Sequence, residues 1–350
     1  MSFCTIALDA MGGDHAPLAV VDGAALFARS NTAVEFLFFG DQKVITPLLK
    51  KHRTLAQKSR IVHTDIKIGS HERPREAFRV DKKNSSMRLA IEAVKRKEAH
   101  CCVSGGNSGA LMGLSKVILG TVSGLDRPAM VSTYPTKKGE TVMLDLGANL
   151  ICNAENLRQF AIMGGAYAFS VLGIKEPKIG LINVGIEDTK GNEVIQEAHS
   201  LIKATELRGD YVGFIEGDDI AKGQIDVVVT DGFTGNVALK ASEGLARLIQ
   251  AYLRRAFTGS FFGKLAYVFC YVPLKTLRKQ LDPRKNNGAV LVGLNGISVK
   301  SHGSTDGVGF SYAITVAYNL HKSGFIERIE RRLSHLQRVN AEITSLRDKT

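Results

Sequence analysis

The 350-residue sequence predicts an α/β fold in which a largely parallel sheet is covered by helices on both faces. Short apolar runs rich in β-branched residues alternate with periodic segments of helical length, and most of the runs end in Gly, Asp or Asn. This alternation is typical of βαβ units, in which a helix connects two parallel strands. Because such folds bind ligands at the carboxyl ends of their strands, we expect the loops that follow the strands to carry the function.

Ten apolar runs are predicted to be strands. They are residues 5–8, 34–39, 60–63, 100–103, 129–133, 141–144, 178–184, 211–215, 226–230 and 289–294. Neither a linker rich in Pro or Ser nor an internal repeat interrupts the pattern. We therefore expect residues 1–323 to form one α/β domain.

A different pattern follows in residues 324–350. Apolar side chains recur there with a spacing typical of a helix, separated by Arg and Glu: Ile326, Ile329, Leu333, Leu336, Ile343 and Leu346. This spacing predicts a C-terminal amphipathic helix. We expect it to pack either on its own domain or, because its apolar stripe is narrow, against a helix of a partner.

Positive charge is concentrated in two regions of the chain. The net charge is +12, from 46 Lys and Arg against 34 Asp and Glu. Residues 43–97 contain 16 basic and 5 acidic residues, and residues 244–281 contain 7 basic residues and no acid. These regions predict acidic partners, although lysines that only solvate helix faces would give a similar pattern. A nucleic-acid partner is disfavoured, because the first region offers one aromatic residue, Phe78, for base stacking.

Several classes of protein are disfavoured by the composition. The longest uncharged apolar stretch, residues 265–274, is half the length that a membrane-spanning helix of about 20 residues needs. The N-terminal residues lack the basic and apolar regions of a secretory signal. The cysteines show no CxxC spacing, so we expect buried thiols in a reducing cytoplasm, and predict neither a metal nor a cofactor. They are Cys4, Cys101, Cys102, Cys152 and Cys270.

The loop after the first predicted strand, residues 9–17, combines flexible and polar residues. Gly12 and Gly13 allow another backbone to approach closely, and Asp14 and His15 offer a carboxylate and an imidazole. Pro17 is well placed to start a helix.

The loop at residues 104–110 is rich in glycine and opens a helix predicted over 110–119. Its candidate ligand-binding residues are Gly105, Gly106, Asn107 and Ser108. A helix N-terminus presents unpaired N–H groups and the positive end of the helix dipole, which suits a phosphate. A plain tight turn is the alternative.

Three further loops and one late segment carry polar candidates. In residues 185–193, Lys190 is one cation among three carboxylates, either a solvent-facing ion-pair partner or a charge that stabilises an oxyanion or phosphate. The other candidates are Asn149, Asp231, Asn236 and His302. The sequence has no GxSxG, HExxH or GxGxxG motif, which disfavours an acyl-enzyme, a metal-activated water and a nicotinamide dehydrogenase. Direct reaction between two positioned substrates fits better.

Six motifs follow one another along the chain. They are IALDAMGGDHAP (6–17), SGGNSGALMG (104–113), LDLGAN (144–149), LINVGIEDTKGNE (181–193), DVVVTDGFTGNVALK (226–240) and LVGLNGISVKSHGS (291–304). In this order they closely resemble the PlsX-type phosphate acyltransferases of bacterial phospholipid synthesis. The likeness extends over nearly the whole chain up to about residue 323.

The resemblance implies transfer of a fatty acyl group from an acyl carrier protein thioester to inorganic phosphate. A membrane acyltransferase then uses the acyl phosphate to acylate glycerol-3-phosphate. The implied fold is a three-layer α/β/α homodimer akin to phosphotransacetylases and isocitrate-type dehydrogenases, acting in the cytoplasm at the inner face of the cell membrane. Carried over by motif, Lys190 and Asn236 are the expected catalytic residues. A CoA-dependent phosphotransacetylase is the alternative.

The mechanism that fits both the residues and the resemblance is direct attack by phosphate on the thioester. Backbone N–H groups of Gly106, Asn107 and Ser108 are expected to hold the phosphate. Lys190 and the Asn236 amide are expected to stabilise the oxyanion of the tetrahedral intermediate. Secondary candidates, for which a structural role is as good an explanation, are Asp14, His15, Asp231 and His302.

The second basic region is also aromatic. Residues 252–271 hold seven of the 24 Phe and Tyr residues of the chain. Aromatic side chains interleaved with cations are typical of an element that binds anionic lipid, and the candidates for membrane contact are Phe257, Phe261, Phe262 and Phe269. A hydrophobic hairpin buried at a dimer interface is the alternative.

Overall fold

The computed structural model describes residues 3–280, 282–331 and 333–334. Within these residues eleven strands form a single sheet in the order β3-β2-β1-β4-β11-β10-β5-β6-β9-β7-β8. The strands are β1 (Cys4–Asp9), β2 (Val34–Gly40), β3 (Ser59–His63), β4 (Cys101–Ser104), β5 (Ala129–Thr136), β6 (Gly139–Leu144), β7 (Lys178–Ile182), β8 (Asp210–Ile215), β9 (Val227–Val229), β10 (Ala289–Val292) and β11 (Ile297–Lys300).

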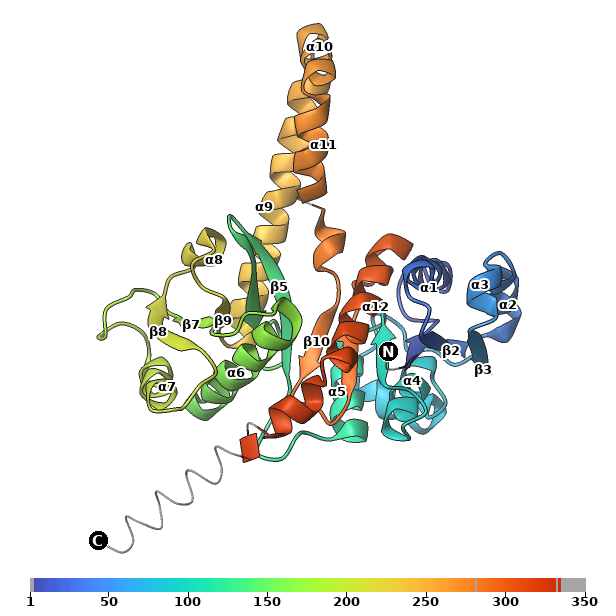
Figure 1. The fold of residues 1–350 in the computed structure, drawn as a ribbon, viewed down its shortest axis with the longest axis horizontal. Helices are drawn as coiled ribbons and strands as arrows, with labels where there is room; N and C mark the ends of the chain where they lie inside the picture. Colours follow the sequence, from blue (N-terminus) through green and yellow to red (C-terminus); the bar gives the residue numbers. More distant parts are fainter. Residues whose placement is uncertain (1–2, 281, 332, 335–350) are drawn as a thin grey trace, which may run out of the picture.

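The helices alternate with the strands for most of the chain (Figure 1). They are α1 (Leu18–Ser30), α2 (Gln42–Lys50), α3 (Arg53–Ala56), α4 (Ser86–Lys95), α5 (Ser108–Leu119), α6 (Ala154–Tyr167), α7 (Glu193–Lys203), α8 (Asp219–Lys222), α9 (Gly232–Thr258), α10 (Phe261–Phe269), α11 (Tyr271–Gln280) and α12 (Gly307–Lys322). Short helical turns are η1 (Pro74–Phe78), η2 (Val80–Lys82), η3 (Ala168–Leu172) and η4 (Pro283–Asn286).

Two parallel blocks make up most of the sheet. Strands β3, β2, β1, β4 and β11 pair in parallel, and so do β6, β9, β7 and β8. Between the blocks, β10 is antiparallel to β11 and to β5, and β5 is antiparallel to β6. These three reversals make the blocks run in opposite directions. The loops after β1, β4 and β11 therefore leave one edge of the sheet, and those after β6, β9 and β7 leave the other.

The molecule has three layers because side chains of each strand alternate between two cores. Ile6 and Leu8 of β1 belong to the core that α1, α6 and α12 cover, whereas Ala7 between them belongs to the core under α4 and α5. A third cluster under α8 includes Ile220 and Val228. The predicted three-layer fold with a largely parallel sheet is confirmed.

All ten predicted strands are confirmed, and their ends differ from the prediction by no more than three residues. Strand β11 was not predicted, because no strand was assigned to the late segment after residue 294. It is only four residues long and follows β10 after a tight turn around an Asn-Gly pair, so its apolar pattern is short. It lies at the centre of the sheet, between β4 and β10.

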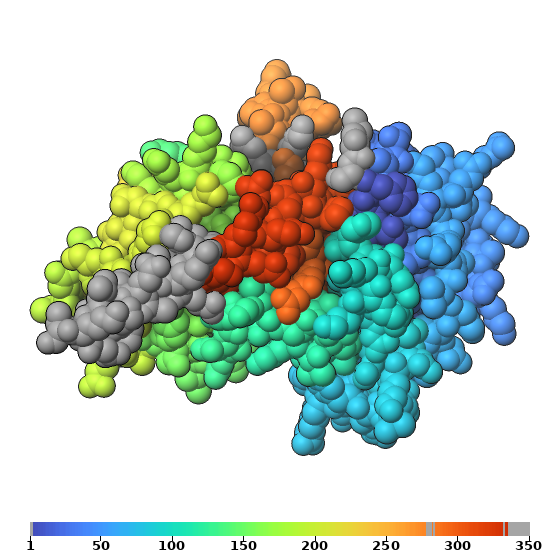
Figure 2. Space-filling view, turned by 60° about the horizontal axis from the view of Figure 1, so that its bottom comes forward, coloured from blue at the N-terminus to red at the C-terminus, as the bar shows by residue number. Residues whose placement is uncertain are grey.

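The start of the predicted C-terminal helix packs on its own domain. Phe325, Ile329 and Leu333 are buried in the same core as α12. Figure 2 shows α12 in red, lying between the blue and cyan first block and the green and yellow second block. Leu336, Ile343 and Leu346 lie outside the described residues, so the helix over 324–350 remains a prediction for that part.

An arm formed by α9, α10 and α11 projects from the body (Figure 1). Helix α9 is 27 residues long, and α10 packs back on it, with the rings of Phe257 and Tyr267 6.0 Å apart. No residue of α10 is buried. In the described part of the chain, no helix combines the length and the apolar character needed to cross a bilayer.

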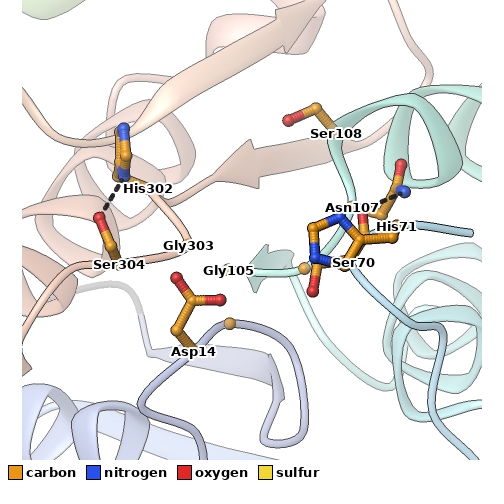
Figure 3. Close-up of a pocket in the computed structure, with 11 residues that line it drawn as sticks. Asp14, Ser70, His71, Gly105, Asn107, Ser108, His302, Gly303 and Ser304 are labelled. Carbon is orange, nitrogen blue, oxygen red and sulfur yellow. Dashed lines mark hydrogen bonds between the residues drawn. The ribbon is translucent and has the colours of Figure 1, made fainter.

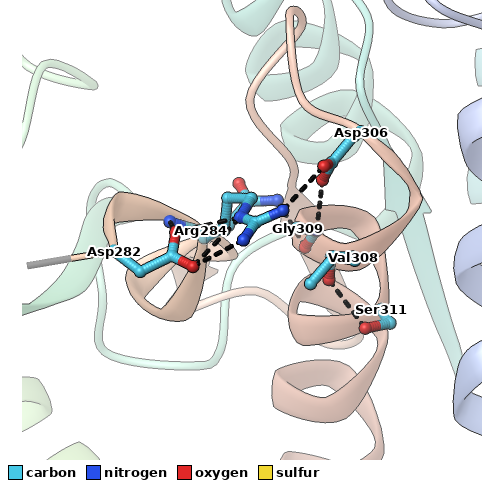
Figure 4. A network of polar contacts seen from close by, with 7 residues as sticks. Asp282, Arg284, Asp306, Val308, Gly309 and Ser311 are labelled. Atoms are coloured by element: carbon cyan, nitrogen blue, oxygen red, sulfur yellow. Dashed lines mark hydrogen bonds and ion pairs between the residues drawn. The ribbon is translucent and has the colours of Figure 1, made fainter. Parts of the chain in front are cut away.

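A polar network ties the returning end of the arm to α12 (Figure 4). Arg284 in η4 donates to Asp282 at 2.7 Å and to Asp306 at 2.8 Å. Asp306 is the N-cap of α12 and accepts a hydrogen bond from the N–H of Gly309 at 3.0 Å. The base of the arm is thereby attached to the loop that joins β11 to α12.

Candidate active site

The loops after β1, β4 and β11 surround a cavity of about 420 Å³, which we call the glycine-rich pocket (Figure 3). Its lining residues are Gly13, Asp14, Ser70, His71, Gly105, Gly106, Asn107, Ser108, His302, Gly303 and Ser304. Most of them were predicted from three motifs that are far apart in the sequence. His15 lies beside it and lines a smaller recess behind Gly13 and His302.

Glycine is required where the first two loops touch. A Cβ on Gly12 would lie 2.3 Å from Asp9 Oδ2 and 2.7 Å from the nitrogen of Gly106, and a Cβ on Gly105 would lie 2.8 Å from the oxygen of Gly12. Gly13 has a φ of 109°, which disfavours any side chain. The motif glycines therefore bring the two backbones into contact.

Asp9, the last residue of β1, stabilises these loops through hydrogen bonds. The sequence analysis did not single it out. Its buried carboxylate accepts hydrogen bonds of 2.6 Å from the hydroxyls of Ser86 and Ser104. Ser104 in turn accepts from the N–H of Gly106 at 3.0 Å. Burial raises the pKa of Asp9, and these hydrogen bonds oppose that rise. A carboxylate at the end of a buried apolar strand was the sequence pattern that could have pointed to Asp9.

Asn107 shapes the helix end of the pocket. It is the N-cap of α5, accepting from the N–H of Ala110 at 3.0 Å. Its amide donates to the backbone oxygens of Ser70 at 3.0 Å and Glu72 at 2.8 Å. These hydrogen bonds hold the segment before η1 against the pocket. The first N–H groups of α5 have no partner within the helix, and such groups are suited to bind an anion.

His302 and its neighbours form the opposite wall (Figure 3). The N–H of His302 donates to Asn287 Oδ1 at 2.8 Å, and its ring Nδ1 lies 3.1 Å from the Ser304 hydroxyl. Burial lowers the pKa of His302, and the charges of Lys240 and Lys300 lower it further. The lowered pKa favours the neutral form of the imidazole.

Lys300 is a second residue that the sequence analysis missed. It ends β11 directly before the pocket-lining residues, and its ammonium donates to the backbone oxygens of Ser301 and, at 3.5 Å, Gly105. Burial lowers the pKa of Lys300 to about 8. The sequence analysis assigned no strand to the segment after residue 294, and within that segment it singled out only His302.

The loops after β6, β9 and β7 form a second cluster, which contains the other predicted residues. Asn149 is buried and donates through its amide to Asp145 at 2.9 Å and to the oxygen of Pro128 at 2.8 Å. Asp231 caps α9, accepting from the N–H of Thr234 at 2.9 Å and from its hydroxyl at 2.7 Å. Both residues therefore support the loops.

Lys190 and Asn236 follow the neighbouring parallel strands β7 and β9 and are exposed. The Lys190 backbone is held by the Asn183 amide, which donates to its oxygen at 3.1 Å. In the part of the chain that the structure describes, neither the Lys190 ammonium nor the Asn236 amide has a hydrogen-bond or ion-pair partner. Both groups are available to a substrate.

Exposed apolar side chains occur in the loops after β6 and β7 and in the first turns of α9. Each is more than half exposed: Leu150, Ile151, Val184, Ile186, Phe233 and Val237. Exposed apolar side chains on the segments that carry two free polar donors suit contact with an apolar chain that ends in a polar carbonyl.

Helix α9 connects the two clusters. Asn236 lies in its first turns, close to Gly147 of the β6 loop. Lys240 is four residues further along the helix, a rise of about 6 Å along its axis. The charge of Lys240 acts on both His302 and Lys300 of the glycine-rich pocket. Among the described residues, no hydrogen bond or ion pair joins Lys190 or Asn236 to that pocket.

One group of metal-ligating side chains comes together within the described residues, away from both clusters. The ligand atoms of Cys4, His100 and His321 lie within 4.8 Å of one another. His100 Nδ1 accepts a hydrogen bond from the N–H of Thr5 at 2.9 Å, which occupies that nitrogen. The five cysteines are free thiols, and Cys4, Cys101 and Cys102 are buried.

Comparison with known families identifies the chain. Residues 4–328 match the family model described as "Fatty acid synthesis protein". The chain belongs to this family. It is 50% identical over 335 residues to a phosphate acyltransferase of Rhodospirillum centenum, covering 96% of this chain and 94% of that protein. A phosphate acyltransferase of Parvibaculum lavamentivorans is 46% identical over 342 residues, covering 98% and 94%. The acyltransferase family inferred from the six motifs is thus confirmed.

Solved structures of phosphotransacetylases share the fold. The enzyme from Streptococcus pyogenes has a TM-score of 0.63 at 16% identity, covering 91% of this chain and 94% of that one. The EutD phosphotransacetylase from Staphylococcus aureus has a TM-score of 0.62 at 15% identity, covering 92% and 94%. At these identities the likeness concerns the fold, and the phosphotransacetylase-like architecture predicted from the sequence is confirmed.

Proposed function

We propose that this acyltransferase moves a fatty acyl group from an acyl carrier protein thioester to inorganic phosphate. The observation that carries the proposal is the sequence identity of 46–50%, over nearly the full length, to proteins named phosphate acyltransferase. A helix N-terminus at a glycine-rich pocket suits phosphate, and the exposed apolar side chains on the segments that carry Lys190 and Asn236 suit an acyl chain. The acyl phosphate product would serve a membrane glycerol-3-phosphate acyltransferase.

In this proposal both clusters act on one long substrate. The thioester carbonyl lies at the amino-terminal turns of α9, where Lys190 and Asn236 stabilise the oxyanion. Phosphate approaches from the glycine-rich pocket, held by the first N–H groups of α5. Because phosphate is an anionic nucleophile at neutral pH, the chain needs to supply position and charge, and no covalent intermediate is required.

The first basic region is the proposed docking surface for the acidic carrier protein. Its segment before and within η1 runs directly beside the pocket, since Ser70 and His71 line the cavity. Three exposed cations lie at this segment: Arg73 directly before η1, Arg75 within it and Arg79 directly after it. A carrier bound there would present its thioester arm next to the pocket entrance.

The decisive experiment is incubation of the protein with acyl carrier protein thioester and phosphate. We expect release of free thiol that depends on phosphate, with formation of acyl phosphate. Thiol release at the same rate without phosphate would contradict the proposal. A clear preference for acyl-CoA would favour the CoA-dependent phosphotransacetylase, the second candidate, whose fold this chain shares.

We also propose that the protein is a homodimer that associates peripherally with the inner face of the cell membrane. Phe261, Phe262 and Phe269 at the tip of the arm are each more than three quarters exposed. Phe257 is only partly exposed because it packs on Tyr267, so it supports the tip. Along the shaft, Leu245, Leu248, Ile249 and Tyr252 form an exposed apolar face that suits a second copy.

Flotation with anionic vesicles tests the membrane contact. Phe261→Ser with Phe262→Ser is expected to abolish co-flotation, because these rings supply the apolar area that would enter the lipid. Leu248→Ser on the shaft is the matched control. It is expected to float with the vesicles and to shift the oligomeric state measured by sedimentation. Undiminished flotation of the tip variant would contradict the role of the tip.

A further inference from the structure

The wall of the glycine-rich pocket combines one carboxylate with donors that need no charge. Among the described residues that line the cavity, Asp14 is the carboxylate, and none is a lysine or an arginine. Serine, asparagine and a neutral histidine can each donate a hydrogen bond without carrying a formal charge. These residues are Ser70, His71, Asn107, Ser108, His302 and Ser304. An anion that enters the pocket therefore meets a negative side chain in its wall.

The backbone fixes the position of Asp14 in the pocket. Its N–H donates to the oxygen of Gly303 at 2.8 Å, which joins the β1 loop to the β11 loop. Gly13, directly before it, has a φ of 109° that few other residues could adopt. Figure 3 shows the carboxylate pointing into the space between His302 on one side and Asn107 on the other.

The Asp14 carboxylate has no hydrogen-bond or ion-pair partner within the part of the chain that the structure describes. Two basic residues are close enough to be affected by its charge. Burial lowers the pKa of Lys300 and of His302, and the negative charge of Asp14 opposes both effects. The Lys300 ammonium nevertheless donates to the backbone oxygens of Ser301 and Gly105. Both oxygens of Asp14 are thus free to accept hydrogen bonds from a ligand.

A free carboxylate in an anion site restricts which anion can bind. An ionised carboxylate only accepts hydrogen bonds, so it repels an anion oxygen that has no proton to share. Inorganic phosphate keeps at least one P–OH group at neutral pH, whereas sulfate and a phosphodiester keep none. Neutral donors together with one acceptor therefore match an oxyanion that still carries a proton.

We propose that Asp14 makes the glycine-rich pocket selective for protonated oxyanions by accepting a hydrogen bond from the P–OH group of inorganic phosphate. The neutral donors of the wall and the first N–H groups of α5 bind the other phosphate oxygens. That phosphate occupies this pocket rests on the proposed function. The role of Asp14 adds that the pocket takes inorganic phosphate and rejects both sulfate and the phosphodiester of a carrier's phosphopantetheine arm.

Three oxyanions of similar shape test the selectivity of the wild type. The dissociation constants of phosphate, arsenate and sulfate are measured by calorimetry at neutral pH and constant ionic strength. Arsenate keeps a proton at this pH, so it should bind within about fivefold of phosphate, whereas sulfate should bind about 100-fold more weakly. Discrimination against sulfate of less than tenfold, or no binding of phosphate and arsenate, would overturn the proposal.

Asp14→Asn removes the charge and keeps the shape of the side chain. Its amide can donate to an oxygen without a proton, so sulfate affinity should rise at least tenfold and approach that of phosphate. Asp65→Asn makes the same change in net charge at an exposed position outside the cavity wall, and its ratio should stay within twofold of the wild type. A merely structural role of Asp14 would change the affinities of all three anions together. An unchanged ratio in Asp14→Asn would overturn the proposal.

Activity measurements separate the possible sources of the phosphoryl group. The KM for the carrier thioester should stay within twofold in Asp14→Asn, because its phosphodiester does not bind in this pocket. A tenfold fall in that KM would show that the phosphodiester enters the pocket, and would overturn the assignment to inorganic phosphate. If the wild type lacks phosphate-dependent acyl transfer, the proposed function fails. The calorimetry, which needs no acyl donor, still decides the role of Asp14.

Discussion

At the scale of single residues, hydrogen bonding separates candidates that look alike in the sequence. Asn107, Asn149 and Asn236 all lie in polar segments that follow strands, yet the amides of the first two donate to backbone oxygens of the chain. The amide of Asn236 has no such partner within the described residues. The predicted catalytic pair therefore differs from its neighbours in having free polar ends.

Lys190→Ala and Asn236→Ala should each lower kcat for acyl phosphate formation by roughly 10²–10³, because one donor to the oxyanion is lost. Both residues are exposed, so the thermal unfolding of the variants should match that of the wild type. Asn149→Ala is the matched contrast. It removes a partner of the buried Asp145 and should lower the free energy of unfolding by about 1–3 kcal/mol. Variants of Lys190 and Asn236 with near wild-type kcat would refute their assigned roles.

His321 should make the protein sensitive to acid. Burial lowers its pKa, and the nearby His100, whose ring centroid is 4.2 Å away, lowers it further. Because an unfolded histidine takes up its proton at a higher pH than the folded one, stability should fall as the pH drops through about 6.5. His321→Gln should lose less unfolding free energy between pH 7 and pH 5 than the wild type, measured by urea unfolding. An equal loss would assign the acid sensitivity to other groups.

At the scale of elements, α9 has the most extended role. The sequence analysis placed Asn236 in a polar loop and treated residues 244–281 as a separate basic and aromatic region. The structure joins the two along one helix, α9, which carries Asn236 near its start and forms the first part of the arm at its far end. A helix of this length is stabilised in its first turns by the cap and by packing near the body, since its distal part is exposed.

Asp231→Ala tests how far the cap positions Asn236. The loss of two hydrogen bonds at the N-cap should cost about 1 kcal/mol of unfolding free energy. Because the first turn of α9 would fray, kcat should fall while the KM for phosphate stays unchanged. Asp231→Asn keeps an acceptor and should recover most of both losses. A fall in stability with an unchanged kcat would show that the cap and the catalytic amide are independent.

At the scale of the whole molecule, charge and shape together suggest where a large acidic partner binds. The exposed cations of η1 lie beside the glycine-rich pocket, and the aromatic tip lies at the end of the arm (Figure 1). A carrier protein and a lipid surface could then be bound at the same time.

Arg73→Glu with Arg75→Glu should raise the KM for the carrier thioester at least tenfold at low salt, because both side chains are exposed cations near the pocket. The effect should shrink as salt screens the charges. Lys137→Glu with Lys138→Glu, at the exposed β5–β6 turn, makes the same change in net charge and should leave this KM within twofold. Equal effects of the two double variants would show that only net charge matters.

The sequence by itself determined the ten strands, the three-layer fold class and the family, because these depend on local periodicity and on short motifs. It also indicated the pocket loops, since ligands of such folds bind at the carboxyl ends of the strands. The tertiary structure decided what depends on pairing between distant segments. It placed β11 at the centre of the sheet and reversed the two parallel blocks. It also buried Lys300 and engaged Asn149 and Asp231 in structural hydrogen bonds. Burial and hydrogen-bond partners arise from contacts between residues far apart in the chain, which no local pattern contains.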